Sequence, residues 1–340
     1  GEEPPSACTL LPHSVHAEGG SSPILPVASH GNVIKKMNLS DFSNGTSTDA
    51  TLEIYEDGYT IVKSNSTTPQ TQKINNTWVV NAINNYYENP TIDITSLIYD
   101  SDTRLLVNSM NVYGSGMLSN VGQFRTQRRY NSEIHDFELV GTKLKLIDLS
   151  KTTPINDDGL DEMTDSTPES KHLQFFNTFE NLGVDKLVFG ENWSKVRISS
   201  LSSVFAYAKI KEVVGFDKLK IQTANMNSAF SNSDIGSIDI TKIDLTQLVT
   251  ADRAFDTTSV PVGDLFSRQH ITKLKGASYM FSLYKTDKPL DVTGIDLSDG
   301  GNFNGMFEAV QAPSFKFDFS NARGSFAYAF SRLGMQIDTS

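Results

Sequence analysis

The stretch Met226-Asn-Ser-Ala-Phe230, followed by Ile235-Gly-Ser-Ile238-Asp-Ile240, decides the fold of this chain. Its first part, an apolar residue four positions before a phenylalanine, recurs seven times. Successive phenylalanines are separated by 26, 25, 25, 26, 26 and 23 residues. Self-similarity at a fixed period of roughly 20–50 residues is typical of a solenoid. The marker residues are Phe179, Phe205, Phe230, Phe255, Phe281, Phe307 and Phe330.

A second apolar pattern lies between the phenylalanines. The alternation in Ile235-x-x-Ile238-x-Ile240 and in Phe315-x-Phe317-x-Phe319 predicts a short strand in each repeat, and residues 144–149 are expected to form the first one. A strand and one helical turn cannot bury an apolar face alone, so we expect the repeats to stack into a parallel sheet around a buried phenylalanine ladder. We therefore predict a mixed β/α fold, with a right-handed leucine-rich-repeat-like solenoid of about seven repeats of 23–26 residues.

The residues before the repeats have a different pattern. Residues 1–31 are rich in Pro, Ser and Gly and predict a flexible arm. Residues 32–143 are expected to form a small β-rich domain, and 144–340 the solenoid. In the β-rich part, Asp57-Gly58 predicts a tight hairpin, and residues 77–87 predict a short helix with Trp78, Ala82, Ile83 and Tyr86 on one face. Further strands are expected at 92–94, 105–107 and 137–140.

Composition excludes several classes of protein. The chain of 340 residues has a net charge of −11 and no basic face, which argues against nucleic-acid binding. Its single cysteine, Cys8, excludes an intrachain disulfide and a cysteine zinc site. No apolar run is long enough to insert into a membrane. We expect any signal peptide to be absent or already removed, and residues 338–340 to be a fragment edge.

Several repeats carry a family resemblance. Met226-Asn-Ser-Ala-Phe230 before Ile238-Asp-Ile240, and Phe303-Asn-Gly-Met-Phe307 after Gly294-Ile-Asp-Leu-Ser298, resemble the BspA-like leucine-rich-repeat surface proteins of bacteria. The resemblance covers residues 144–335. The sequence departs from the family pattern by weakening its Asn-Met-x-x-Met-Phe element and by irregular lengths near Pro261 and Pro289. The resemblance implies an exported protein of the bacterial cell surface, often an adhesin, and it provides no catalytic residues.

These patterns predict a binding module rather than an enzyme. Neither a phosphate-binding glycine loop nor a nucleophile elbow is present. We expect an adhesin-like, extracellular protein whose partner is a host or matrix protein, a glycan or a neighbouring cell surface. The alternative is a structural subunit of an extracellular assembly, such as a phage tail or fibre component or a pilus tip. Outward positions beside the predicted strands are candidate ligand-binding residues: Asp239, Thr241, Lys273, Lys275, Lys316 and Asp318.

No cofactor is expected, with calcium as the one alternative considered. The acidic run 156–165 can be aligned with a calcium-binding loop through Gly159, although Pro154 then falls at the first ligand position. A solvated linker explains the same run equally well. The candidate ligands are Asn156, Asp158, Glu162 and Asp165.

Overall fold

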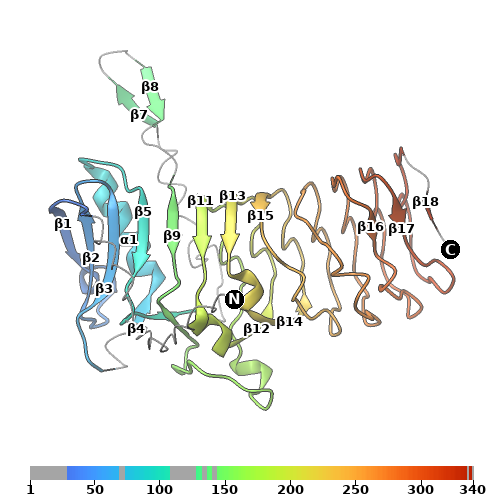
Figure 1. Cartoon of the computed structure of the whole chain (residues 1–340), viewed down its shortest axis with the longest axis horizontal. Coiled ribbons are helices and arrows are strands. Elements are labelled where there is room, and N and C mark those ends of the chain that lie inside the picture. Colours follow the sequence, from blue (N-terminus) through green and yellow to red (C-terminus); the bar gives the residue numbers. More distant parts are fainter. Residues whose placement is uncertain are drawn as a thin grey trace, which may run out of the picture.

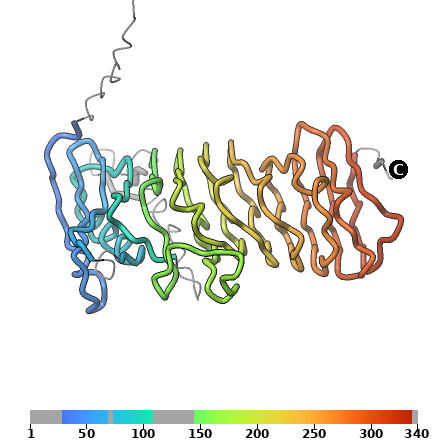
Figure 2. Tube along the Cα trace, turned by 60° about the horizontal axis from the view of Figure 1, so that its bottom comes forward, coloured from blue at the N-terminus to red at the C-terminus, as the bar shows by residue number. Residues whose placement is uncertain are grey.

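A computed structural model describes residues 29–68, 73–107, 128–131, 136–139, 144–334 and 337–338. The molecule is elongated, and its strands and loops lie side by side in sequence order (Figure 1, Figure 2). The fold is mixed α/β, with one large, mostly parallel sheet and few helices. The sheet has eight strands. In order across it they are β1 (Val33–Asn38), β2 (Ala50–Tyr55), β3 (Tyr59–Ser64), β5 (Ser96–Tyr99), β9 (Leu146–Asp148), β11 (Gly183–Val188), β13 (Lys209–Val214) and β15 (Asp234–Ser237).

Four smaller sheets and five short helices complete the described part of the chain. The sheets are β10 (Thr153–Ile155) with β6 (Arg104–Leu106) and β4 (Lys73–Asn75), β12 (Arg197–Ser200) with β14 (Lys220–Asn225), β16 (Leu290–Asp291) with β17 (Phe315–Lys316) and β18 (Ile337–Asp338), and β7 (Arg128–Asn131) with β8 (Asp136–Leu139). The α-helix is α1 (Asn76–Glu88), and the 3₁₀ helices are η1 (Leu39–Phe42), η3 (Glu169–Lys171), η4 (Glu191–Lys195) and η5 (Phe216–Lys218).

The large sheet runs across the domain boundary predicted at residue 143. Its first three strands pair antiparallel, and all later pairings in it are parallel. Strand β5 of the predicted β-rich domain pairs with β9 of the repeat region, with Leu97 opposite Ile147. The division into 32–143 and 144–340 therefore separates two sequence patterns that share one sheet. Of the predicted arm, residues 1–28 lie outside the described residues.

The predicted hairpin and helix near the N-terminus are confirmed. Gly58 has a φ of 85°, and a Cβ there would lie 2.3 Å from the Asp93 carbonyl oxygen, so the turn requires glycine. Helix α1 begins at the cap residue Asn75, whose side chain accepts a hydrogen bond from the Thr77 N–H at 2.9 Å. Of its predicted inner face, Ala82, Ile83 and Tyr86 are buried and Trp78 is partly buried.

Two of the three further strand predictions are supported. Strand β6 covers part of 105–107, and β8 covers most of 137–140, whose last residue lies outside the described part. The strand predicted at 92–94 is wrong, because the strand there begins only at Ser96. The phenol oxygen of Tyr86 accepts the Ile92 N–H at 2.9 Å and donates to the Ile92 carbonyl at 2.7 Å, so this backbone is bound by the helix instead.

The apolar-x-x-x-Phe motif forms two consecutive β-turns and not the helical turn that we expected. In the second repeat, the Val204 N–H donates to the Leu201 carbonyl at 3.1 Å, and the Ala208 N–H donates to the Phe205 carbonyl at 3.0 Å. The third residue of each turn has a positive φ, as a type II turn requires. These residues are Asn177, Asn181, Ser203, Tyr207, Ser228, Asn232, Arg253, Thr257, Tyr279, Leu283, Gly305, Ala309, Tyr328 and Arg332.

Hydrogen bonds between neighbouring repeats hold these turns. In the second repeat, the alternate N–H groups of Leu201, Ser203, Phe205 and Tyr207 donate to carbonyls of the third repeat at 2.8–3.0 Å. The same pattern joins each repeat to the next from the first to the seventh. A left-handed conformation costs an ordinary residue about 1–2 kcal/mol. Lateral hydrogen bonds, each worth about 0.5–1.5 kcal/mol, offset that cost, so positions such as Tyr207 need not be glycine.

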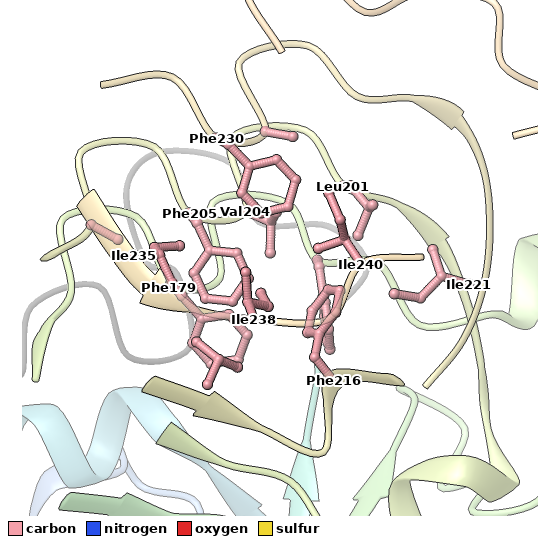
Figure 3. Packing of buried hydrophobic residues seen from close by; sticks show 14 of the residues in the cluster. Phe179, Leu201, Val204, Phe205, Phe216, Ile221, Phe230, Ile235, Ile238 and Ile240 are labelled. Atoms are coloured by element: carbon pink, nitrogen blue, oxygen red, sulfur yellow. The ribbon is translucent and has the colours of Figure 1, made fainter. Parts of the chain in front are cut away.

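The seven marker phenylalanines form the predicted buried ladder. Phe179, Phe205 and Phe230 stack in a row, with ring centroids 5.2 and 5.8 Å apart (Figure 3). The remaining neighbours in the ladder are 5.3–5.7 Å apart and nearly parallel. The first six rings are fully buried, whereas Phe330 is partly buried. The predicted core is therefore confirmed, with its last member less covered than expected.

The Asp-x-Thr and Asp-x-Ser pieces of the repeats form corners. One carboxylate oxygen of Asp239 accepts the Thr241 N–H at 2.9 Å and the Thr241 hydroxyl at 2.6 Å. Equivalent contacts turn the chain at Asp244, Asp291, Asp296 and Asp318. Such Asx turns compete with strand pairing. The strand predicted over 235–240 therefore ends at Ser237.

Candidate functional site

A long loop, residues 156–172, interrupts the repeats before the first phenylalanine motif and leaves the stack beside β12 (Figure 1). Loops of more than about 12–15 residues within a compact fold are uncommon and often functional. The loop is fixed to the stack by Arg104, which donates to the Asp161 carboxylate at 2.7 Å and to the Gly159 carbonyl at 2.9 Å. Arg197 of β12 pairs with Asp165 near the other end of the loop.

The loop forms one wall of a groove on the face that carries β12 and β14. The main hollow has a volume of about 650 Å³. Thr164, Asp165 and His172 line it from the loop, and Arg197 and Lys220 line it from the two strands. A second hollow of about 320 Å³ shares His172. Its other polar lining residues are Glu169, Ser199, Gln222, Gln247 and Lys273.

Three cations occupy corresponding places on neighbouring segments of the groove. Arg197 pairs in register with Lys220 across β12 and β14. The bridge between Gln222 and Asp244 aligns the following segment, so Lys242 stands two residues before its bridge just as Lys220 does. We call Arg197, Lys220 and Lys242 the basic row. Within the described residues Lys220 and Lys242 make no salt bridge, whereas Arg197 pairs with Asp165.

His172 connects the loop to the groove floor. Its Nε2 lies 2.9 Å from the Thr167 carbonyl, and its Nδ1 lies 2.6 Å from the Ser199 hydroxyl. A carbonyl oxygen only accepts, so Nε2 carries a proton, and in the neutral ring Nδ1 accepts from Ser199. The imidazole thus fixes the loop over β12 from inside the groove.

Asp244 is the acidic residue whose charge is most fully engaged at the groove. Thr246 donates its N–H at 2.8 Å and its hydroxyl at 2.6 Å to one carboxylate oxygen, and Gln222 donates to the other at 2.8 Å. Burial raises the pKa of Asp244, but these hydrogen bonds outweigh it and hold the pKa below its ordinary value. Asp244 is therefore ionised at neutral pH.

The structure places the six candidate ligand-binding residues in different local surroundings. Only Lys273 lines either hollow, where it donates to the Gln247 side chain at 2.6 Å. Lys275 forms an ion pair with Asp299 at 2.5 Å, and Lys316 lies in β17. The remaining three belong to corners described above: Asp239, Thr241 and Asp318.

Three of the four predicted calcium ligands are engaged with neighbouring protein groups. Asn156 is buried; its side chain donates to the Lys171 carbonyl at 2.8 Å and accepts the Leu160 N–H at 2.9 Å. Asp158 pairs with the Lys171 ammonium at 2.5 Å, Asp165 pairs with Arg197, and Glu162 is exposed. In the part of the chain that the structure describes, no three His, Cys, Asp or Glu side chains are grouped to hold a metal ion.

The basic row and His172 were not identified from the sequence. The spacings from Arg197 to Lys220 and from Lys220 to Lys242 are 23 and 22 residues, whereas the phenylalanines of the same repeats are 25–26 residues apart, so the three cations do not align by counting. The available signal was the interruption of the repeat at 156–172.

The comparisons with known proteins identify no relative. No protein-family model, curated protein or solved structure matches the chain. Among the described residues, no helix has both the length and the apolar character to cross a bilayer.

Proposed function

We propose that this chain is a non-catalytic binding module of an extracellular surface protein, built as a right-handed, leucine-rich-repeat-like solenoid. The solenoid proposal is supported by the offset of about one repeat between hydrogen-bonded segments, both in the turns and between the parallel strands β11, β13 and β15. Extended faces of such stacks commonly serve as binding surfaces. The extracellular location and the adhesin-like role follow from the resemblance of the repeats to bacterial surface proteins.

The observation that carries the binding proposal is the groove beside the loop 156–172. Elsewhere on the stack, turns and corners use many of their polar groups on one another. In the groove, two lysines without a salt bridge among the described residues, Lys220 and Lys242, line the same hollow as Arg197, His172 and Gln222, and a wall of irregular chain borders them. A concave site with a few convergent polar groups is the usual form of a ligand site.

The test is a binding screen of the intact chain against immobilised glycans and matrix proteins. The intact chain is required because β5 and β9 pair across residue 143, so fragments cut there would each expose a sheet edge. We expect saturable binding that Gln222→Ala with Gln247→Ala weakens. A matched pair, Gln311→Ala with Asn321→Ala at exposed places outside the groove, should leave it unchanged.

Two results would redirect the proposal. Saturable binding that is equally strong in both double variants would place the ligand on another face. If the intact chain binds nothing in the screen and forms a defined oligomer in solution, a structural subunit of a larger assembly becomes the better description.

A further inference from the structure

We propose that the ligand of the groove is an acidic polysaccharide that lies along the stack, with its acidic groups on the basic row Arg197, Lys220 and Lys242. This inference rests on the proposed binding function and names the chemical class of its ligand. Three observations support it: the local charge, the spacing of the cations and the hydrogen-bonding groups beside them.

The charge of the groove differs from that of the whole chain. The chain has a net charge of −11, which repels anions at long range, yet four cations and three carboxylates line the main hollow. Of the carboxylates, Asp165 is paired with Arg197, and Asp244 is held by Thr246 and Gln222. The third, Asp217, is exposed and makes no salt bridge among the described residues. Of the cations, Lys218 is paired with Glu191, so Lys220 and Lys242 are the two positive charges most available to a ligand.

The spacing of the basic row favours a chain of sugar rings over an extended peptide. Neighbouring strands lie about 4.7–4.9 Å apart, so the backbone positions of Arg197 and Lys220, which pair in register, are separated by about that distance, and Lys242 follows on the next segment. Side chains on one face of an extended peptide recur only every two residues, or about 6.6–6.8 Å. One pyranose ring advances a polysaccharide by a length closer to the first spacing.

Backbone pairing also argues against a peptide at this place. Strand β12 pairs with β14 on one side and is bridged through Ile198 to Leu173 on the other. Strand β14 is bridged through Gln222 to Asp244 on its far side. A peptide that binds by strand addition needs a free sheet edge, and the groove floor does not present one.

Groups suited to sugar hydroxyls lie next to the basic row. Gln222 uses its amide nitrogen on Asp244, and Gln247 uses its amide oxygen on Lys273. The second hollow therefore presents the Gln222 oxygen as an acceptor and the Gln247 nitrogen as a donor. Arg197 contributes its guanidinium, and its side chain is partly exposed to the groove although it also pairs with Asp165.

The experiment measures binding of the intact chain to four soluble probes at about 50 mM and about 200 mM salt. The probes are heparin fragments, oligogalacturonate, neutral maltooligosaccharide and polyglutamate. The test variant is Lys220→Gln with Lys242→Gln. Its matched control, Lys35→Gln with Lys209→Gln, removes the same charge from exposed lysines that line neither hollow and make no salt bridge in the described part of the chain.

We expect one of the two acidic glycans to bind more tightly than maltooligosaccharide and polyglutamate, and more weakly at the higher salt. The test variant should lose about ten-fold in affinity, which corresponds to about 1.4 kcal/mol, and the control should change by less than about two-fold. This result would support the inference.

Three results would overturn it. Preference for the neutral glycan would refute the acidic class and leave the binding function standing. Equal affinity for polyglutamate would show that charge alone decides and that sugar rings are not recognised. Binding to none of the probes, together with a negative screen of glycans and matrix proteins, would remove the binding function as well.

Discussion

Replacing Phe255 with alanine should lower the free energy of unfolding by about 4 kcal/mol. The ring is fully buried and stacks between Phe230 and Phe281, with both centroids 5.3 Å away. The edges of Phe266 and Tyr284 close the same space at 5.6 and 6.2 Å. A buried Phe→Ala change costs about 3–5 kcal/mol, and the cost is largest where the site cannot collapse. The lateral hydrogen bonds of Phe255 to the next repeat oppose collapse here.

Phe330→Ala is the matched control, because Phe330 occupies the same position in the last repeat and is only partly buried. Its ring stacks on Phe307 at 5.7 Å and has no later marker phenylalanine among the described residues. We expect Phe330→Ala to lower the free energy of unfolding by about 2 kcal/mol, since the Phe330 ring buries less apolar surface on folding than the Phe255 ring does.

The assay for both variants is urea unfolding followed by far-ultraviolet circular dichroism, with midpoint and slope fitted separately. The slope matters because stacked repeats can unfold in parts, and a changed slope would reveal this. A loss below about 1.5 kcal/mol at Phe255, or equal losses at both positions, would contradict a ladder in which an inner ring is held by two neighbours and the last ring by one.

Three further predictions concern single groups. Hydrogen bonds from the Thr241 hydroxyl and N–H lower the pKa of Asp239, so the carboxylate stabilises the fold above the unfolded pKa of about 3.9 and loses this effect as pH falls through the folded pKa. We therefore expect the urea midpoint of Asp239→Asn to fall less than that of the unchanged chain between about pH 6 and about pH 3. Burial raises the pKa of Tyr284 to about 12, so the free energy of unfolding should decline as pH rises from about 10 towards 12. Tyr284→Phe should lessen that decline between about pH 8 and about pH 11, and should cost about 1–2 kcal/mol at neutral pH because the hydrogen bond to the Val260 carbonyl is lost. A Cβ on Gly305, whose φ is 62°, would lie 2.3 Å from the Tyr279 ring. A double-mutant cycle should therefore give a cost of about 2–3 kcal/mol for Gly305→Ala in the unchanged chain and only about 1 kcal/mol in a Tyr279→Ala background.

The core could be predicted from the sequence because its signal is periodic. Each marker phenylalanine occupies the equivalent core position of its repeat, and burial of an aromatic ring is a dominant contribution to the energy of a core. The hairpin at Gly58 was predictable for a different reason, since its turn requires a residue without Cβ. Both features depend on short stretches of chain.

The conformation of the phenylalanine motif could not be predicted in the same way. A left-handed backbone conformation is most favourable for Gly and Asn. Among the fourteen turn residues with a positive φ, only Asn177, Asn181, Asn232 and Gly305 are of these types. Thr257, a β-branched residue, argues against the observed φ. The deciding contribution is the set of hydrogen bonds between repeats, which a propensity read along one repeat does not contain.

The candidate site could not be predicted from the sequence for a related reason. The same reason indicates where such stacked repeats can bind a ligand. Along the regular repeats, backbone N–H groups are used on the next repeat, and aspartates such as Asp239 are used on their own corners. Polar groups that close on one another have little capacity left for a partner. Single lysines such as Lys35 and Lys209 are also without a salt bridge among the described residues, but they line neither hollow. Where the period is broken, the loop 156–172 forms a wall, and Lys220 and Lys242 lie together in the groove beside it. In such a fold, regular repeats provide stability and an irregular insertion is the place to look for function.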